Sequence, residues 1–178
     1  IGKYSLEELA QLRQWGSPTT GHPEFEVERG VENTSGPLGQ GHTFAVGAAI
    51  AAKFLAAKTG NPTFAKETIY AYISDGGIQE EISQGAARVA GVLGLDNLIM
   101  FYDSNDIQLS TETAEVMNED TAAKYRALAW EVIEINGNDA AEIRKAIEAA
   151  KAVVGKPTLI IGKCIMGKGA LKADGSSY

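Results

Sequence analysis

Hydrophobic residues recur along the chain as short continuous apolar runs and as longer segments with helical spacing. The short runs cover residues 68–74, 97–103, 130–135 and 157–164, and the helical segments cover 5–14, 40–57, 79–93, 119–128 and 140–153. The run 97–103 is apolar on both faces, which is typical of a parallel strand covered by helices. Strands that alternate with helices predict an α/β fold, a parallel sheet flanked by helices.

Three helical segments carry further expectations. Ser5 and Glu8 form an N-cap pattern at the start of segment 5–14. Segment 40–57 is apolar around much of its circumference, so we expect a buried helix, and its small residues at 47–52 suit either a domain core or a subunit interface. In segment 79–93, apolar residues share one helical face, which predicts a helix that Gly94 ends. They are Ile82, Ala86, Val89, Ala90 and Leu93.

Residues 19–39 are rich in Gly, Pro, Thr and Ser and separate two helical segments. This composition marks a long loop. We expect a binding loop rather than a tether, because it contains an apolar Phe25 that is predicted to be buried.

Composition limits the classes of function. The chain has 178 residues and 44% hydrophobic content, enough for one domain with a real core. A formal net charge of −7 argues against nucleic-acid binding, which depends on clustered Lys and Arg. The single cysteine, Cys164, cannot form an internal disulfide, and neither a signal peptide nor a membrane-span pattern is visible, so the expected location is the cytoplasm. The first residue, Ile1, and a polar tail after residue 171 predict a fragment.

Two neighbouring strands are each followed by an oxygen-bearing side chain, Asp75 after the first and Asn105 after the second. The carboxyl ends of parallel strands line one crevice, so these oxygens can converge on a hard divalent cation. Gly76 and Gly77 would let a phosphate approach the backbone, and Ile107 can offer only its carbonyl oxygen. The alternatives are a plain Asp-Gly turn and a solvated Asn105.

An Asp-Gly followed about thirty residues later by Asn resembles the thiamine diphosphate motif, usually Gly-Asp-Gly and then Asn. The likeness extends to the cofactor-binding half of transketolase and covers nearly the whole chain. It rests on segments in the same order: Gly21-His-Pro-Glu-Phe-Glu26, Gly30-Val-Glu32, Thr34-Ser-Gly-Pro-Leu-Gly-Gln-Gly41, Asp75-Gly76, Gln79-Glu80, Tyr102-Asp103, Asn105, Asp120, Arg126 and Gly155-Lys-Pro-Thr158.

The resemblance implies a set of residue roles. Asp75, Asn105 and the carbonyl of Ile107 would hold Mg²⁺ (or Ca²⁺ or Mn²⁺), and Gly76 would meet the diphosphate of the cofactor thiamine diphosphate. The cofactor rings would lie along the loop residues Gly36, Pro37 and Leu38. Of the two residues implied in catalysis, His22 would reach the substrate hydroxyls, and Glu80 would belong to a carboxylate network at the contact between subunits.

His42 has no role in the family pattern and is expected only to start a helix. Two departures from the pattern matter: Ser74 stands where the family usually has the first glycine of Gly-Asp-Gly, and the chain lacks several further residues of the family. The family also uses histidines before and after this segment, and a glutamate on a separate domain of the partner subunit that activates the aminopyrimidine. None of these has a counterpart here, so residues 1–178 are expected to be one thiamine diphosphate-binding domain, truncated at both ends and inactive alone.

The activity implied by the resemblance is transfer of a two-carbon ketol unit from a ketose phosphate to an aldose phosphate, in the pentose phosphate pathway. The expected parent is a cytoplasmic homodimer, in which a pyrimidine-binding domain completes the site. Other readings stay open: dihydroxyacetone synthase or 1-deoxyxylulose-5-phosphate synthase, the half-subunit of a split transketolase, and a non-catalytic scaffold.

Overall fold

Four parallel strands form the single sheet of this computed structural model, which describes residues 2–109, 111–171 and 175–176. The strands are β1 (Ile69–Ser74), β2 (Leu98–Ser104), β3 (Glu131–Asn136) and β4 (Thr158–Lys163), and their order in the sheet is β1-β2-β4-β3. Each predicted strand is present, which confirms the α/β fold. Ile1 and most of the polar tail after Leu171 lie outside the described residues.

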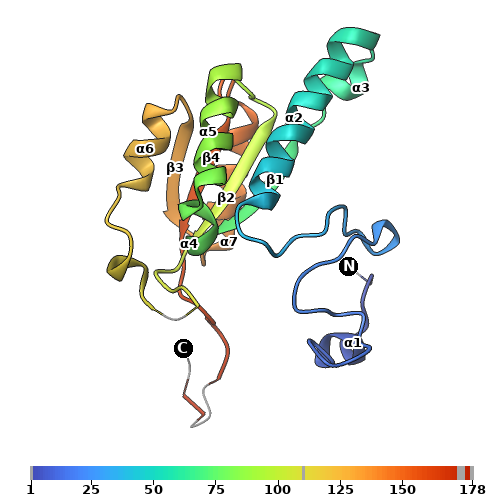
Figure 1. Ribbon diagram of the computed structural model, residues 1–178, viewed down its shortest axis with the longest axis vertical. Coiled ribbons are helices and arrows are strands. Elements are labelled where there is room, and N and C mark those ends of the chain that lie inside the picture. The colour runs from blue at the N-terminus through green and yellow to red at the C-terminus, as the bar shows by residue number, and fades with distance from the viewer. Residues whose placement is uncertain (1, 110, 172–174, 177–178) are drawn as a thin grey trace.

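Helices cover both faces of the sheet (Figure 1). One face carries α2 (Gln40–Thr59), α5 (Glu81–Leu93) and α6 (Thr121–Ala127), and the other carries α7 (Ala140–Lys151). Shorter elements are α1 (Leu6–Ala10), α3 (Pro62–Ala65), α4 (Asp75–Gln79) and the 3₁₀ turns Val27–Arg29 and Thr113–Glu115. The larger apolar core lies on the α2–α5 side, around Met100, Tyr125 and Trp130, and the smaller one lies beneath α7.

The N-terminal segment differs from its prediction. Ser5 caps α1 through a capping box, as expected, but the helix ends at Ala10 rather than at residue 14. The segment lies beside the sheet rather than on it (Figure 1). Phe25 is 65% exposed, so its predicted burial is wrong. The reason is that the loop packs locally, through Arg29 bridging Glu8 and Glu26, and not on the core.

The helical pattern at 79–93 gives two helices instead of one. Glu80 is extended, with ψ of 134°, and separates α4 from α5. The apolar face expected for this segment is buried only in part. Ala90 is buried and Ala86 packs against the core, whereas the larger side chains of Ile82, Val89 and Leu93 are about half exposed. Small side chains allow α5 to approach its neighbours closely: a Cβ on Gly91 would lie 1.8 Å from the Leu128 carbonyl oxygen.

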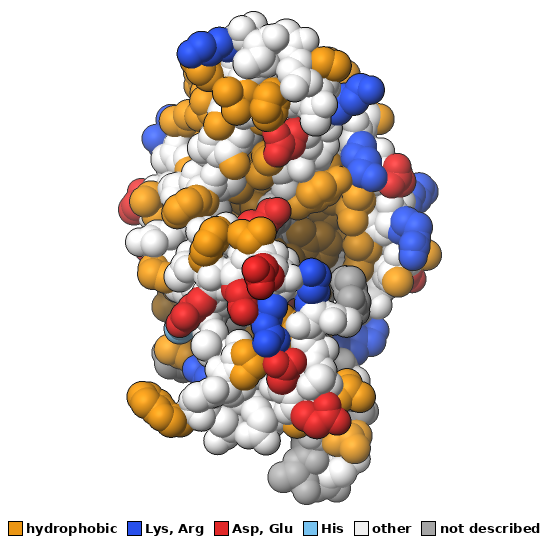
Figure 2. Space-filling view, turned by 90° about the vertical axis from the view of Figure 1, so that its right-hand side faces the viewer, with side chains coloured by type: hydrophobic (Ala, Val, Ile, Leu, Met, Phe, Trp, Pro, Cys, Tyr) orange, Lys and Arg blue, Asp and Glu red, His pale blue; other side chains and the backbone are white. Residues whose placement is uncertain are grey.

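Only one face of α2 is buried, although the helix was expected to be buried as a whole. Ala45, Val46 and Ala49 face the core, whereas Phe44 and Phe54 are 60% and 59% exposed. Figure 2, which looks onto the side of the molecule that carries α2 and β1, shows many hydrophobic side chains at the surface. None of the helices within the described ranges is long and apolar enough to cross a membrane.

Candidate functional site

The ends of β1 and β2 bring Asp75 and Asn105 together. The strands pair with Ser74 opposite Asp103, so both residues follow at the same edge of the sheet. Asp75 is 1% exposed, and its Oδ2 accepts a hydrogen bond from the backbone N–H of Asn105 at 3.0 Å. The Oδ1 of Asn105 in turn accepts from the N–H of Ile107 at 3.1 Å. The three residues predicted as metal ligands are therefore joined by hydrogen bonds, which use the backbone N–H groups of Asn105 and Ile107.

The Asp75 carboxylate is buried without a cationic partner. Its Oδ1 accepts a hydrogen bond of 2.6 Å from the Tyr102 hydroxyl, and no ion pair within the described part of the chain involves it. Burial and the hydrogen bond to Asp75 raise the pKa of Tyr102, so the phenol stays a neutral donor. A buried carboxylate that meets only neutral donors lacks the opposite charge that such groups usually have. A divalent cation would supply it.

Ser74 has a structural function at this corner. Its side-chain oxygen accepts a hydrogen bond from the Gly77 N–H at 3.3 Å and caps α4, so Asp75 is the first residue of a helix rather than part of a simple turn. A Cβ on Gly76 would lie 3.2 Å from Cδ1 of Leu38. The predicted diphosphate residue and the predicted ring-contact loop are therefore in close contact.

The glycine-rich loop is packed between His22 and the junction of α4 with α5. Gly36 has a φ of 148°, and a Cβ there would lie 2.8 Å from Cγ of His22. Gly39 has a φ of 81°, and a Cβ there would lie 3.0 Å from Cβ of Glu80. Side chains are disfavoured at both positions by the backbone and by the neighbours. His22 itself is exposed, and Glu80 is half-buried.

His42 is buried in the first turn of α2, directly after this loop. The side chain is 4% exposed, and neither ring nitrogen has a hydrogen-bond partner within the described residues. Burial lowers the pKa of His42 to about 4, so the imidazole is neutral near pH 7. His42 also lines a cavity of about 150 Å³, whose other walls are formed by the glycine-rich loop and the end of β1.

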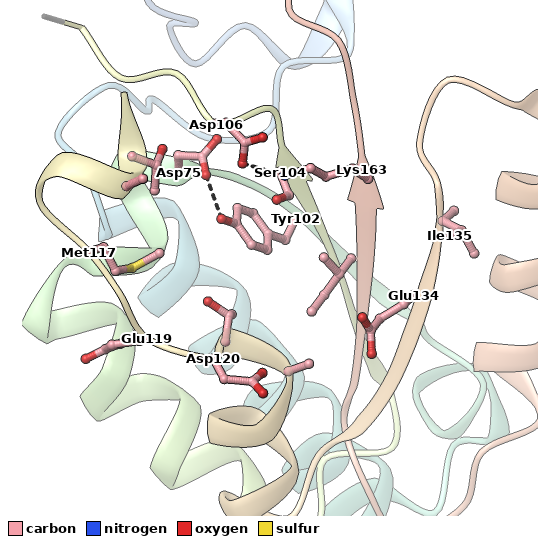
Figure 3. A pocket seen from close by; sticks show the side chains of 15 residues that line it. Asp75, Tyr102, Ser104, Asp106, Met117, Glu119, Asp120, Glu134, Ile135 and Lys163 are labelled. Atoms are coloured by element: carbon pink, nitrogen blue, oxygen red, sulfur yellow. Dashed lines mark hydrogen bonds and ion pairs between the residues drawn. The ribbon is translucent and has the colours of Figure 1, made fainter. Parts of the chain in front are cut away.

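A larger cavity of about 480 Å³ is lined in part by Asp75 and Tyr102 (Figure 3). Its acidic residues other than Asp75 already have partners. Asp106 pairs with Lys163, Glu134 with Arg126 and Glu119 with Lys124, and Asp120 caps α6. Within the described ranges, no three His, Cys, Asp or Glu side chains cluster so that they could hold a metal ion. The predicted ligand set differs from such a cluster, because it has one carboxylate, one amide oxygen and one carbonyl.

Sequence reasoning missed two contacts at this site. Tyr102 was part of the family resemblance, but its contact with Asp75 was not predicted. The ion pair of Lys163 with Asp106 was not predicted either. The register of β1 with β2 places Tyr102 opposite Ile73, two residues before Asp75. A tyrosine in a buried strand needs a partner for its hydroxyl, and that need is the signal that could have identified the contact.

Nearly the whole chain is similar to proteins of one known family. Residues 2–178 match the family model described as transketolase, thiamine diphosphate binding domain. Transketolase from Streptococcus pyogenes serotype M6 is 47% identical over 176 residues, which are 97% of this chain and 24% of that protein. Transketolase 1 of Saccharomyces cerevisiae is 48% identical over 177 residues, 97% of this chain and 26% of that protein.

Solved structures agree with the sequence matches. A Campylobacter jejuni transketolase structure has a TM-score of 0.78 at 44% identity and covers 89% of this chain and 25% of that chain. A Pichia stipitis transketolase structure, in complex with xylulose-5-phosphate, has a TM-score of 0.84 at 37% identity and covers 95% of this chain and 27% of that chain. The chain spans about a quarter of the length of these relatives. It belongs to the transketolase family, as its thiamine diphosphate-binding domain.

Proposed function

We propose that residues 1–178 form one thiamine diphosphate-binding domain of an enzyme that transfers a two-carbon ketol unit from a ketose phosphate to an aldose phosphate. The observation that carries the proposal is the buried Asp75 carboxylate, which has Asn105 beside it and no cationic partner in the described part of the chain. Such a group fits a divalent cation that holds a diphosphate.

In this proposal the metal ligands are Asp75, the amide oxygen of Asn105 and the carbonyl oxygen of Ile107. The metal is Mg²⁺, with Ca²⁺ and Mn²⁺ as substitutes, and Gly76 meets the diphosphate. The cofactor supplies the electron sink for the two-carbon unit when it is bound. The support for this ligand set is the chain of hydrogen bonds that joins the three residues.

The glycine-rich loop supplies the surface for the cofactor rings, through Gly36, Pro37 and Leu38. Support comes from the close approach of Leu38 to Gly76, which brings the ring and diphosphate residues together. His22 lies against Gly36 and is exposed, so its imidazole is free to donate to a hydroxyl of the sugar substrate. By orienting that hydroxyl, His22 would position the substrate beside the cofactor.

Glu80 and the apolar face of α2 belong, in this proposal, to a homodimer contact. Phe44 and Phe54 are exposed on α2, and Ile82 is exposed two residues beyond Glu80. Exposed apolar surface of this kind is typical of protein interfaces. The partner subunit would contribute the pyrimidine-binding domain and its glutamate. We further propose a cytoplasmic, pentose-phosphate-pathway enzyme, with the single Cys164 in support of a reducing compartment.

Calorimetry on the full-length protein tests the cofactor site. Thiamine diphosphate should bind in the presence of Mg²⁺ and lose its affinity when the metal is removed with a chelator. Transfer from xylulose-5-phosphate to an aldose phosphate then tests the reaction. Metal-independent binding, or none, would contradict the proposal and favour a non-catalytic scaffold.

A further inference from the structure

Tyr102, on strand β2, contacts the Asp75 carboxylate, which is the proposed metal ligand. It is 3% exposed and donates its hydroxyl hydrogen to Oδ1 of Asp75 at 2.6 Å. Figure 3 shows the phenol directed at the Asp75 carboxylate, with the hydrogen bond drawn between them. The backbone N–H of Asn105 donates to the other oxygen, Oδ2. Each carboxylate oxygen therefore accepts one hydrogen bond from a donor of fixed position.

Tyr102 belongs to a buried and paired strand, whereas the Asn105 N–H follows directly after that strand. Tyr102 pairs with Ile73 in the β1–β2 ladder, and its neighbours Met100 and Leu98 are fully buried. A phenol has few rotatable bonds, so the sheet fixes where its hydroxyl lies. Moving the hydroxyl away would break its hydrogen bond to Oδ1 of Asp75, which costs free energy. The geometry thus holds the Asp75 side chain in one rotamer.

We propose that Tyr102 is a positioning residue that holds Asp75 as a one-oxygen metal ligand and so favours Mg²⁺ over Ca²⁺. The inference rests on the proposed function, because it takes Asp75 to be a metal ligand. Mg²⁺ requires near-ideal octahedral geometry, whereas Ca²⁺ accepts more ligands, longer distances and carboxylates that bind through both oxygens. A carboxylate fixed by two donors is less free to rotate toward the two-oxygen arrangement.

Partners of metal ligands usually matter for affinity, since their loss weakens metal binding by roughly 10-fold to 100-fold. Removing only the Tyr102 hydroxyl leaves the ring packing intact and frees Oδ1 of Asp75. Mg²⁺ should lose the affinity that came from the fixed geometry. Ca²⁺ should lose less, because the freed oxygen can join its coordination. A merely structural function for Tyr102 would not change the ratio of the two affinities.

Tyr125 offers a matched control. It is also fully buried, but its hydroxyl has no hydrogen-bond partner within the described residues. Tyr125→Phe therefore removes the same atom from the same core without touching Asp75. Thermal unfolding of both variants without metal reports any loss of stability separately from metal affinity.

The experiment titrates MgCl₂ and CaCl₂ into the full-length protein at a fixed concentration of thiamine diphosphate, and follows binding by calorimetry. In Tyr102→Phe the Mg²⁺ affinity should fall roughly 10-fold to 100-fold, and the ratio of Mg²⁺ to Ca²⁺ affinity should fall by about fivefold or more. Tyr125→Phe should keep both affinities. Equal losses for the two metals, or no loss, would overturn the Tyr102 assignment alone. Failure of the wild-type protein to bind thiamine diphosphate with either metal would overturn the proposed function as well.

Discussion

Asp75 and His42 are two buried ionisable side chains in the same domain, and their surroundings differ sharply. Both oxygens of Asp75 accept a hydrogen bond, whereas neither nitrogen of His42 has a partner within the described residues. A buried polar group with fixed partners is held in position for chemistry. One without partners lowers stability and contributes no fixed geometry. Asp75, at the strand ends, is therefore held in a fixed position, whereas His42, beside the glycine-rich loop, is less constrained.

The largest expected effect comes from removing the Asp75 carboxylate, the fixed group in this comparison. Asp75→Ala should weaken metal-dependent binding of thiamine diphosphate by roughly 100-fold or more, because it removes the charged ligand itself. Asp106→Ala is the control, since Asp106 is exposed and pairs with Lys163. Its effect should stay within about threefold, because exposed ion pairs contribute little. Equal effects of the two substitutions in calorimetry would contradict the ligand assignment.

The next effect concerns His42 and pH. The folded state lowers the pKa of His42 from 6.5 to about 4, so between these values the unfolded chain binds a proton that the folded chain does not. Stability should therefore fall as pH drops from 6.5 towards 4, by about 1.4 kcal/mol for each pH unit. Above pH 6.5 this contribution should be constant. Urea unfolding of the full-length protein across this range measures it.

A substitution separates the contribution of His42 to the pH dependence of stability from the contributions of other titrating groups. His42→Leu should remove its share of the pH dependence and raise stability near pH 7 by about 1–2 kcal/mol, since no buried nitrogen is left unpaired. The chain has two histidines, and His22→Leu serves as the control because His22 is exposed. Identical pH curves for the wild type and His42→Leu would show that the imidazole is hydrated or hydrogen-bonded in solution.

Substitution of Gly36 tests whether stability and cofactor binding depend on the backbone conformation of the glycine-rich loop. Gly36→Ala places a methyl group 2.8 Å from the His22 ring at a φ of 148°, so we expect a loss of about 1–3 kcal/mol in stability and weaker cofactor binding. Gly41→Ala is the control, because it lies in α2 with nothing within 4 Å of its added carbon. It should be neutral or stabilise by up to about 1 kcal/mol. Thermal unfolding and calorimetry of the two variants give both quantities.

The smallest effect concerns the exposed pair of Lys163 and Asp106 at the rim of the larger cavity. The side chains are 60% and 62% exposed, so Lys163→Ala should cost at most about 1 kcal/mol. The loss should shrink further in high salt, which screens surface charges. A larger or salt-independent loss would mean that Lys163 has a further function at the cavity.

Local patterns in the sequence were enough to predict the architecture. The apolar runs located all four strands, and the alternation of strands with helices predicted the parallel sheet. The capping box at Ser5 was also predicted correctly, since a cap depends on residues three positions apart. The burial of the helix faces was predicted only in part. Helix α5 presents small residues to the core and larger ones to the surface, which hydrophobicity alone does not indicate.

The sequence by itself determined where the strands end and therefore which residues, Asp75 and Asn105, could share an edge of the sheet. Only the tertiary structure decided the order and register of the strands, and with them the contact of the Tyr102 hydroxyl with Asp75 and of Leu38 with Gly76. The physical reason is the range of the interactions. Strand formation and capping depend on neighbours along the chain, whereas these contacts join residues that only the packed sheet brings within a few ångströms.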